Sequence, residues 1–404
     1  MGGEPFLQTR GAGAYAYGPD GRRYLDYLMA YGPLLLGHAH PALSTGLDAL
    51  AARGMVFGST APDEVRLAER IRGHLPSMER IRFASTGSEA VMSAIRVARA
   101  FSGRDAILKF AGNYHGHFDL ALLDAGASAH TRSARHSGIP PAVTGDLIVA
   151  RFNDLGTVDA ALDSAAGRLA AIVVEPVVGN MGLVLPVAGF LQGLQQRARA
   201  CGALLIFDEI ITWLRLGLGG AQELLGVRPD LTTVGKILGG GAPLAAFGGR
   251  ADVMAVLAPD GPCFTGGTHA GNPFGVALAL RTLDWLEAHP EAYRAMELRA
   301  QRLAAGIRVE LARLALDYAV VQLASIVDFK FRPGPPTRDY GDALRADARA
   351  FAAYYHGMRE RGVLLAPSQN EVMFLSTEHG DADIEATIMA IGATLDGLRR
   401  QGTV

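Results

Sequence analysis

The sequence predicts an α/β protein built on a mostly parallel central sheet, with a smaller α+β domain formed by both ends of the chain. Three observations indicate this architecture. The chain has 404 residues, which is too long for one ordinary hydrophobic core. Short apolar runs recur through its middle, each bounded by turn or charged residues, as in strands buried on both faces. A helical pattern lies between the first two of these runs, and an alternation of strand and helix is typical of parallel sheets.

Composition and charge describe a globular protein with a large interior. Hydrophobic residues make up 49% of the chain and charged residues 19%, and 38 basic side chains oppose 40 acidic ones. No basic run with interleaved aromatic residues indicates a nucleic-acid partner. No apolar run reaches the roughly 18 residues of a membrane span, and the first residues lack the pattern of a signal peptide. Cys201 and Cys263 are too few and too far apart for a disulfide framework or a metal site, so we expect a cytoplasmic protein without a bound metal.

The first expected element is a hairpin in AYAYGPDGRRYLDYL, where aromatic residues alternate around a turn at residues 19–21. RIRFAS then predicts a strand followed by a helix that ends at Gly103. The apolar face of this helix is expected to carry Val91, Ala94, Ile95, Ala98 and Phe101. Further strands are expected in DAILKF, AAIVVEP, ALLIFDE and LTTVGK, and SIVDFKFRPGPP predicts a strand that leads into a turn.

These elements predict two domains. Residues 51–290 are expected to form the large α/β domain. Residues 1–50 and 291–404 are expected to form the small α+β domain together.

The main functional signals lie where the expected strands end, because open α/β sheets bind ligands at that edge. Residues 85–90, STGSEA, open the predicted helix. A helix start with small hydroxyl residues and a glycine can hold a phosphate, although Ser and Thr there are also ordinary N-caps. Asp208 and Glu209 end the strand ALLIFDE. This pair is either an N-cap or ion-pair feature, or it holds a carboxylate for a cationic ring nitrogen.

Lys236 follows the next expected strand and precedes a run of glycines. The 38 basic residues include only three lysines, Lys109, Lys236 and Lys330, and the other two lie inside strand-like runs where we expect them to snorkel or pair. The glycines let another molecule approach closely. A buried lysine amine can become a nucleophile, whereas arginine stays protonated. An amine, a carboxylate on the neighbouring strand and an anion-binding helix start are the parts that pyridoxal phosphate requires.

Six ordered motifs make the sequence resemble the class III aminotransferases, in particular their glutamate-1-semialdehyde 2,1-aminomutase branch. The motifs are RFASTGSEAVMSAIRVARAFSGR, KFAGNYHGHFD, VVEPVVGNMG, LLIFDEIIT, DLTTVGKILGGG and GTHAGNP. The resemblance extends from about Gly11 to Glu371. It implies a pyridoxal-phosphate-dependent enzyme of fold type I, with small-molecule amine and carbonyl substrates and an obligate homodimer.

The same resemblance implies roles for individual residues. Lys236 matches the lysine that forms the Schiff base with the cofactor and moves the substrate proton, and Asp208 matches the partner of the pyridine nitrogen. The other matches are Ile210 and Tyr114 on opposite faces of the ring, Gly87 and Ser88 at the phosphate, Gly267 and Thr268 reaching the phosphate of the second subunit, and Glu175 and Asn180 near the cofactor oxygen and the substrate amine. His115 could instead be an ordinary turn histidine, and Glu209 is expected to be structural.

Positions on the substrate side depart from the family. The aminomutases carry an additional N-terminal segment with an arginine for the substrate carboxylate, and we expect this chain to lack it. Tyr31 stands where a tryptophan is usual, Trp213 precedes Leu-Arg215 where the family has Gly-Phe-Arg, and His269 replaces a leucine or phenylalanine. Glu371, by contrast, matches an acidic residue of the aminomutase branch.

From this pattern we expect a ping-pong aminotransferase whose acceptor is either neutral or held through its carboxylate by Arg215. The alternatives are the aminomutase itself, a racemase or epimerase on the same scaffold, and a homologue that binds no cofactor.

Overall fold

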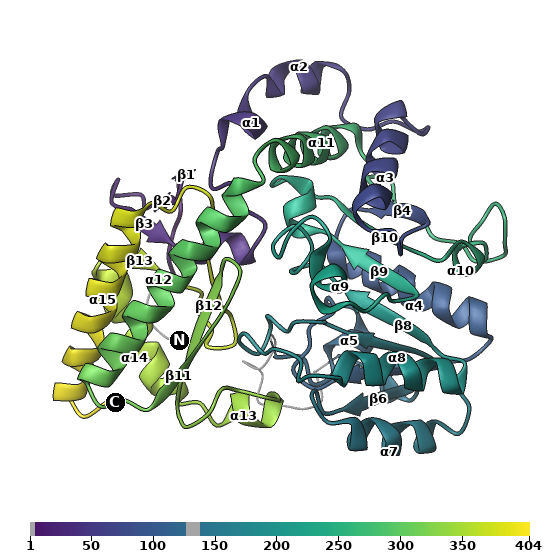
Figure 1. Cartoon of the computed structure of the whole chain (residues 1–404). Helices are drawn as coiled ribbons and strands as arrows, with labels where there is room; N and C mark the ends of the chain where they lie inside the picture. Colours follow the sequence, from purple (N-terminus) through teal and green to yellow (C-terminus); the bar gives the residue numbers. More distant parts are fainter. Residues whose placement is uncertain (1–4, 127–137) are drawn as a thin grey trace. The chain divides into compact units, whose positions relative to one another are not determined.

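The computed structural model describes residues 5–126 and 138–404 (Figure 1). The chain divides into two compact units, which we describe separately. Unit 1 comprises Met1–Thr45, Gly179–Val184 and Trp285–Val404, and unit 2 comprises Gly46–Val178 and Leu185–Asp284. The short internal segment Gly179–Val184 groups with the two ends of the chain. The assignment of residues 51–290 to one domain and of 1–50 and 291–404 to the other stays a proposal.

Unit 2 is built on a sheet with seven strands in its described residues, in the order β4-β10-β9-β8-β7-β5-β6. The strands are β4 Arg80–Ala84, β5 Ala106–Phe110, β6 Leu147–Ala150, β7 Leu169–Val174, β8 Leu204–Asp208, β9 Leu231–Val234 and β10 Ala245–Gly249. Strands β6, β5, β7, β8 and β9 pair in parallel, and β10 pairs antiparallel with both β9 and β4. The expected α/β architecture is therefore confirmed.

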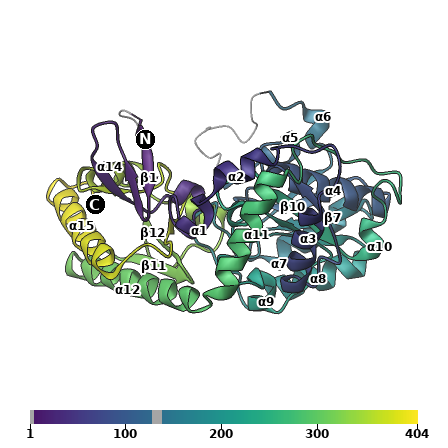
Figure 2. The ribbon, with the colours of Figure 1, turned by 90° about the horizontal axis from the view of Figure 1, so that it is seen from above.

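Helices cover both faces of this sheet. Helix α4 (Gly87–Ser102) lies on one face, and α7 (Leu155–Ala165) and α8 (Phe190–Cys201) lie on the other (Figures 1 and 2). The buried face of α4 includes Ala90, Val91, Ala94, Ile95 and Ala98, which pack against strand residues of the central core. Gly103 ends the helix at φ 65, in the left-handed region. Phe101, expected on the buried face, is 39% exposed because it lies in the last turn, beyond the sheet contacts.

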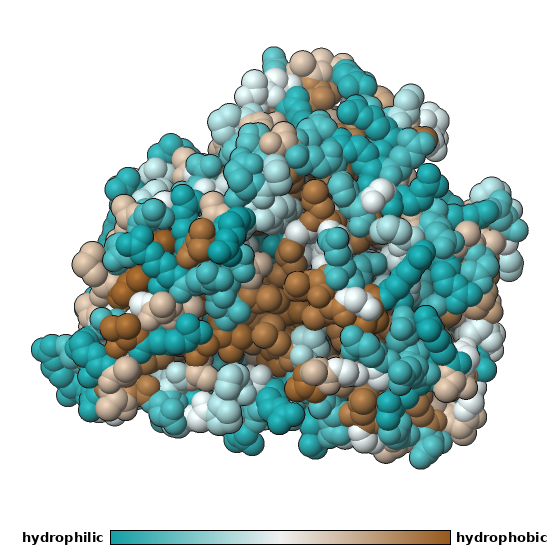
Figure 3. All heavy atoms as spheres, viewed as in Figure 1, coloured by the Kyte–Doolittle hydropathy of each residue, from teal (hydrophilic) through white to brown (hydrophobic). Residues whose placement is uncertain are grey.

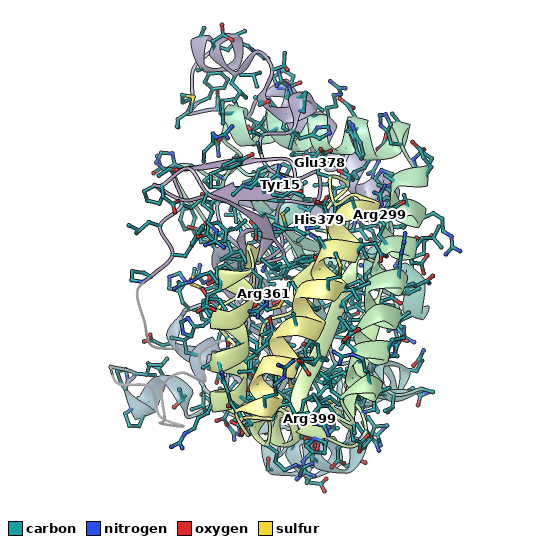
Figure 4. All side chains as sticks on the ribbon, turned by 90° about the vertical axis from the view of Figure 1, so that its left-hand side faces the viewer. Tyr15, Arg299, Arg361, Glu378, His379 and Arg399 are labelled. Carbon is teal, nitrogen blue, oxygen red and sulfur yellow. The ribbon has the colours of Figure 1, made fainter. Side chains whose placement is uncertain are left out.

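Unit 1 contains two small sheets. One pairs β1 (Arg10–Ala12), β2 (Tyr15–Tyr17), β3 (Arg23–Asp26) and β13 (Val363–Leu364), and the other pairs β11 (Tyr318–Leu323), β12 (Ile326–Pro333) and β14 (Met373–Phe374). The expected hairpin is confirmed as the antiparallel pair β2 and β3. The sheets share a hydrophobic core with α12 (Glu291–Arg313), α14 (Ala348–Glu360) and α15 (Asp381–Arg400). Tyr15, Arg299, Glu378 and His379 lie near the start of α15, and Arg399 lies near its end (Figure 4).

The remaining helices are shorter or connect these elements. They are η1 Met29–Tyr31, α1 Pro41–Ser44, α2 Leu47–Ala52, α3 Pro62–His74, α5 Asp119–Leu122, α6 Pro141–Thr144, α9 Gly220–Leu225, η3 Lys236–Gly239, α10 Ala251–Met254, α11 Pro273–Ala288 and α13 Tyr340–Leu344. Within the described ranges, no helix combines the length and apolar character needed to cross a bilayer. Hydrophobic residues nevertheless gather on the face drawn in Figure 3, amid a mostly hydrophilic surface.

Candidate active site

The two residues expected to carry the chemistry follow neighbouring parallel strands. Strand β8 ends at Asp208, which lies opposite Thr233 of β9 in the parallel register. Lys236 comes two residues after the end of β9, is partly buried and begins η3. Its φ of 47 lies in the left-handed region, which is strained for a residue with a side chain. The carboxylate and the amine are thus placed at the same edge of the sheet, where such folds bind ligands.

Asp208 is buried and its carboxylate is oriented by three donors. Oδ2 accepts a hydrogen bond from Nδ1 of His115 at 2.7 Å. Oδ1 accepts hydrogen bonds from the backbone N–H of Ile210 at 3.2 Å and from Oγ1 of Thr233 at 3.3 Å. Because an ionised carboxylate can accept about four hydrogen bonds, one further donor can still be accommodated.

His115 is a buried neighbour of this carboxylate and not an exposed turn residue. Burial lowers its pKa, against the opposing effect of the hydrogen bond to Asp208. The lowered pKa favours the neutral ring, whose Nδ1–H can donate to the Asp208 carboxylate. His115 thus fixes the direction of the Asp208 carboxylate without adding a full charge.

The start of α4 lies against the loops that follow β8 and β9. Thr86 is the N-cap, since its side chain accepts the N–H of Glu89 at 3.2 Å. The first N–H groups of the helix, including those of Gly87 and Ser88, have no partner within the helix and can face an anion. A Cβ at Gly87 would lie 3.1 Å from Cδ1 of Ile210, and one at Gly235 would lie 3.0 Å from the same atom. Ile210 therefore fills the space between the helix start and the residue before Lys236.

The loop that carries Tyr114 packs against the same helix start. A Cβ at Gly116, whose φ is +102, would lie 2.6 Å from Cα of Ser88. The Ser88 hydroxyl also contacts Nδ1 of His117 at 3.1 Å. Glu175, at the end of β7, accepts the backbone N–H of Tyr114 at 2.8 Å through Oε1. These contacts hold Tyr114, Ser88 and Glu175 in one cluster of unit 2.

Glu209, the second acid of the pair, supports the local structure. It is fully buried, and its oxygens accept hydrogen bonds from the backbone N–H groups of Ala221 and Gln222 and from the Thr212 hydroxyl. Burial raises its pKa, and the first of these hydrogen bonds acts against that rise. The carboxylate therefore satisfies the first N–H groups of α9.

Two substrate-side candidates that follow this pair, Trp213 and Arg215, lie in the interior of unit 2. The indole of Trp213 is 1% exposed and donates its N–H to the carbonyl of Leu218 at 2.8 Å. Arg215 is fully buried. Their assignment to the substrate side stays a prediction.

Three predicted residues lie in unit 1. Asn180 is buried in the segment Gly179–Val184. Tyr31 ends a turn in which Met29, Ala30 and Tyr31 all have left-handed φ values of 44, 53 and 65. Burial raises the pKa of Tyr31, and the charge of Glu371 raises it further, so the two residues lie within electrostatic range of each other.

Asp26 holds the strained turn. Its Oδ1 accepts the N–H groups of Leu28 and Met29 at 2.8 and 3.0 Å, and its Oδ2 pairs with Nε2 of His38 at 2.8 Å. Three consecutive left-handed residues other than glycine are costly, so strong local contacts are needed to maintain them.

Gly267, Thr268 and His269 are exposed on unit 2. Gly267 lines a hollow of about 660 Å³ together with residues of α3, α4, β4 and the loop around residue 265. Their role toward a second subunit stays a prediction.

Sequence reasoning did not single out Thr233, and it left the role of His115 open. Thr233 could have been found from its place near the end of β9, directly opposite Asp208. His115 gave no such signal, because its contact depends on a loop that returns over the sheet.

The described residues fit pyridoxal phosphate in three respects. Glycines at 87 and 235 leave room beside Ile210 that a Cβ would narrow, the helix start offers unpaired N–H groups, and Asp208 can accept one more donor, such as a protonated ring nitrogen. The fold and this arrangement define a pyridoxal-phosphate-dependent enzyme of fold type I.

Comparisons with known proteins agree. The family described as "Aminotransferase class-III" matches residues 2–375, and the chain belongs to this family. A glutamate-1-semialdehyde 2,1-aminomutase from Symbiobacterium thermophilum is 47% identical over 388 residues, covering 96% of this chain and 89% of that protein. Further relatives with the same name are 43% to 45% identical.

Solved structures support the same fold. An omega-transaminase from Sphaerobacter thermophilus matches with a TM-score of 0.91 at 33% identity, covering 98% of this chain and 92% of that one. A transaminase with PLP bound matches with a TM-score of 0.90 at 30% identity, covering 99% of this chain and 92% of that one. The chain is therefore a class III enzyme that uses pyridoxal phosphate.

Proposed function

We propose that the protein is an aminomutase of the glutamate-1-semialdehyde 2,1 type, which moves an amino group between two carbons of one substrate. The observation that carries the reaction class is the pair of Asp208 and Lys236 at adjacent strand ends, beside the start of α4. The choice of substrate is supported by the name shared by relatives at 43% to 47% identity. These relatives favour the aminomutase, which we had expected only as the alternative to an aminotransferase.

We assign the chemistry to residues of unit 2. Bound pyridoxal phosphate supplies an aldehyde for the lysine amine and a ring that accepts electrons from the substrate carbon. Lys236 would hold the cofactor through its ε-amine and would move a proton at the substrate carbon. Asp208 would favour the protonated ring nitrogen, an electrostatic contribution to the rate of about 3 kcal/mol. Ile210 and Tyr114 would hold the ring between them.

The remaining residues bind and orient. Gly87 and Ser88 hold the phosphate through the N–H groups at the start of α4. We assign Glu175 and Asn180 roles near the cofactor oxygen and the substrate amine. We assign Glu371 to substrate binding because it matches the aminomutase branch.

A second candidate is an aminotransferase that acts between two separate substrates. The omega-transaminase match at 33% identity supports it, as do the departures at Tyr31, Trp213 and His269. Tyr31 belongs to a strained turn, and strained backbone commonly marks functional positions. Arg215 would hold an acceptor carboxylate in this candidate.

We further propose a cytoplasmic homodimer. Unit 2 exposes large hydrophobic side chains, namely Met55 (49%), Val56 (42%), Phe57 (41%), Val65 (51%) and Phe264 (75%). Val65 and Gly267 line the same hollow. A second copy covering this area would remove the exposed apolar surface from water, and it would bring Gly267 and Thr268 toward the partner's phosphate site.

The two candidates differ in their need for a second substrate. The protein loaded with pyridoxal phosphate should be given glutamate-1-semialdehyde alone, and product should be counted per active site. An aminomutase continues for many turnovers, whereas an aminotransferase stops after one amino transfer until a ketone or aldehyde acceptor is added. The Lys236→Ala variant should be inactive in both cases. Failure with the semialdehyde, together with sustained turnover of an amine and a keto acid, would decide for the second candidate.

A further inference from the structure

Strand β12 of unit 1 carries a buried ion pair. Asp328 and Lys330 are 7% and 6% exposed, and Nζ of Lys330 lies 3.3 Å from Oδ2 of Asp328. Two residues apart on one strand, they point to the same face. A buried ion pair contributes little net stability, because desolvation offsets the attraction between the charges. The position of this pair therefore calls for another explanation.

The carboxylate of Asp328 is tied to the segment Gly179–Val184. Its Oδ2 accepts the backbone N–H of Leu183 at 2.9 Å. Gly182 has a left-handed φ of +88, and a Cβ there would overlap the Lys330 side chain and the Asp328 carboxylate. The segment thus packs directly against the ion pair at Gly182, which lies two residues after Asn180.

The ammonium of Lys330 is tied to the loop of residues 368–371. It donates a hydrogen bond to the carbonyl of Gln369. This loop is closed by hydrogen bonds from the N–H of Asn370 to the Ser368 hydroxyl and from the N–H of Glu371 to the Ser368 carbonyl, both 3.2 Å.

A direct contact joins the two segments beside the ion pair. The N–H of Gly182 donates to the carbonyl of Asn370 at 2.8 Å. Asp328 holds one segment, Lys330 holds the other, and their attraction holds the two together. Asn180 and Glu371, far apart in sequence, are consequently fixed by one pair of charges.

We propose that Asp328 and Lys330 are positioning residues that set the placement of Asn180 and Glu371 for substrate binding. This inference rests on the proposed function, which places both of these residues on the substrate side. A pair that served stability alone could be replaced by neutral side chains of similar size without loss. A positioning pair cannot, because the bond to Gln369 requires the lysine amine.

The test compares the Lys330→Met variant and the Asp328→Asn/Lys330→Met double variant with the wild-type holoenzyme. The single variant leaves a buried unpaired carboxylate, so we expect it to be destabilised. The double variant should recover the thermal stability of the wild type. Its KM for the substrate that the wild type turns over should nevertheless be about tenfold above the wild-type KM, which corresponds to the loss of one hydrogen bond. Its kcat should change less than KM, and the visible absorbance of the bound cofactor should be unchanged.

Arg302→Met is the matched control, because it removes an exposed ion pair with Glu385 in the same unit. It should alter neither KM nor stability. A double variant with wild-type KM would overturn the positioning role and leave the proposed function intact.

Absence of turnover in the wild type would refute the proposed function instead. Amide hydrogen exchange at residues 180–184 and 369–371 then decides the positioning role. We expect faster exchange at both segments in the double variant and no change in Arg302→Met, and equal protection in all proteins would contradict the inference.

Discussion

Asp208 gains its defined direction from neighbours that are distant in sequence. One of them, His115, contributes a neutral hydrogen-bond donor within 2.7 Å of Oδ2. Hydrogen bonds to a charged group are worth about 1.5 to 3 kcal/mol. A carboxylate that lost this donor would be free to rotate away from its partner on the cofactor ring.

Replacing His115 with alanine should therefore lower kcat about tenfold, since roughly 1.4 kcal/mol corresponds to a factor of ten. His115→Asn should retain more activity, because the asparagine amide places an N–H near the position of Nδ1. Steady-state kinetics of both variants, with cofactor content measured alongside, would test this. Equal activity of the alanine variant and the wild type would show that Ile210 and Thr233 orient Asp208 without help.

Lys109 is a second residue whose environment determines its behaviour. It is 2% exposed, and its Nζ donates to the carbonyls of Ala121 and Leu123 at 2.8 and 2.7 Å. It is therefore hydrogen-bonded in the interior and does not snorkel. Burial lowers its pKa from 10.5 to about 7, and the charges of Asp124 and Glu175 act in the opposite direction.

This shift predicts a pH dependence of stability. Between pH 7 and 10.5 the unfolded chain keeps the lysine proton while the folded protein has lost it, so the free energy of unfolding should rise with pH in this window. The rise is at most about 1.4 kcal/mol per pH unit. Urea unfolding of the wild type and of Lys109→Met at pH 7 and pH 9 isolates this contribution as their difference. A difference that stays flat would show that the amine remains protonated.

At the scale of elements, most strands and helix ends can be predicted from local sequence patterns. The strands that end at Val174 and Asp208 can be predicted from short apolar runs, because strands buried on both faces contain few polar residues. The glycine that ends α4 was readable from its left-handed φ requirement.

Other elements left no local signal. The short strand β10 (Ala245–Gly249) contains two glycines and packs by pairing with β4 and β9, so its propensity alone would not reveal it. The turn of Met29, Ala30 and Tyr31 is left-handed without glycine. Its conformation depends on Asp26, and no local rule predicts that dependence.

The start of α4 offers a test of how closely one element must approach another. Gly116 and Gly103 both have left-handed φ values, +102 and +65, but only Gly116 is crowded by Ser88, and nothing lies within 4 Å of a Cβ at Gly103. Gly116→Ala should push the Tyr114 loop away from the helix start and weaken cofactor binding about tenfold or more. Gly103→Ala should cost only about 1 kcal/mol of stability. Titration of the apoprotein with pyridoxal phosphate, followed by visible absorbance, compares the two, and equal affinities would argue against a tight cradle.

At the scale of the whole molecule, the order of residues in the sequence does not reveal that one internal segment belongs to the unit formed by the two chain ends. The segment Gly179–Val184 lies between stretches of unit 2, yet it belongs to unit 1. It contacts Asp328, Lys330 and Asn370, which are more than a hundred residues away in the chain. Long-range polar contacts of this kind have no periodicity, so a pattern of apolar residues could not predict them.

The proposed dimer is tested best where hydrophobic side chains are exposed. Val65 and Phe264 are 51% and 75% exposed on unit 2, and a charge at either position would have to be buried if a second copy covered it. The Val65→Glu/Phe264→Glu double variant should therefore be a monomer, as measured by sedimentation. The monomer should bind the cofactor more weakly, because Gly267 and Thr268 of a second copy could no longer reach its phosphate. Val309→Glu is the control, since Val309 is 64% exposed on α12 of unit 1 and should tolerate the charge. A double variant that stays dimeric would place the interface elsewhere, whereas a monomer that still binds cofactor tightly would show that each chain holds the phosphate alone.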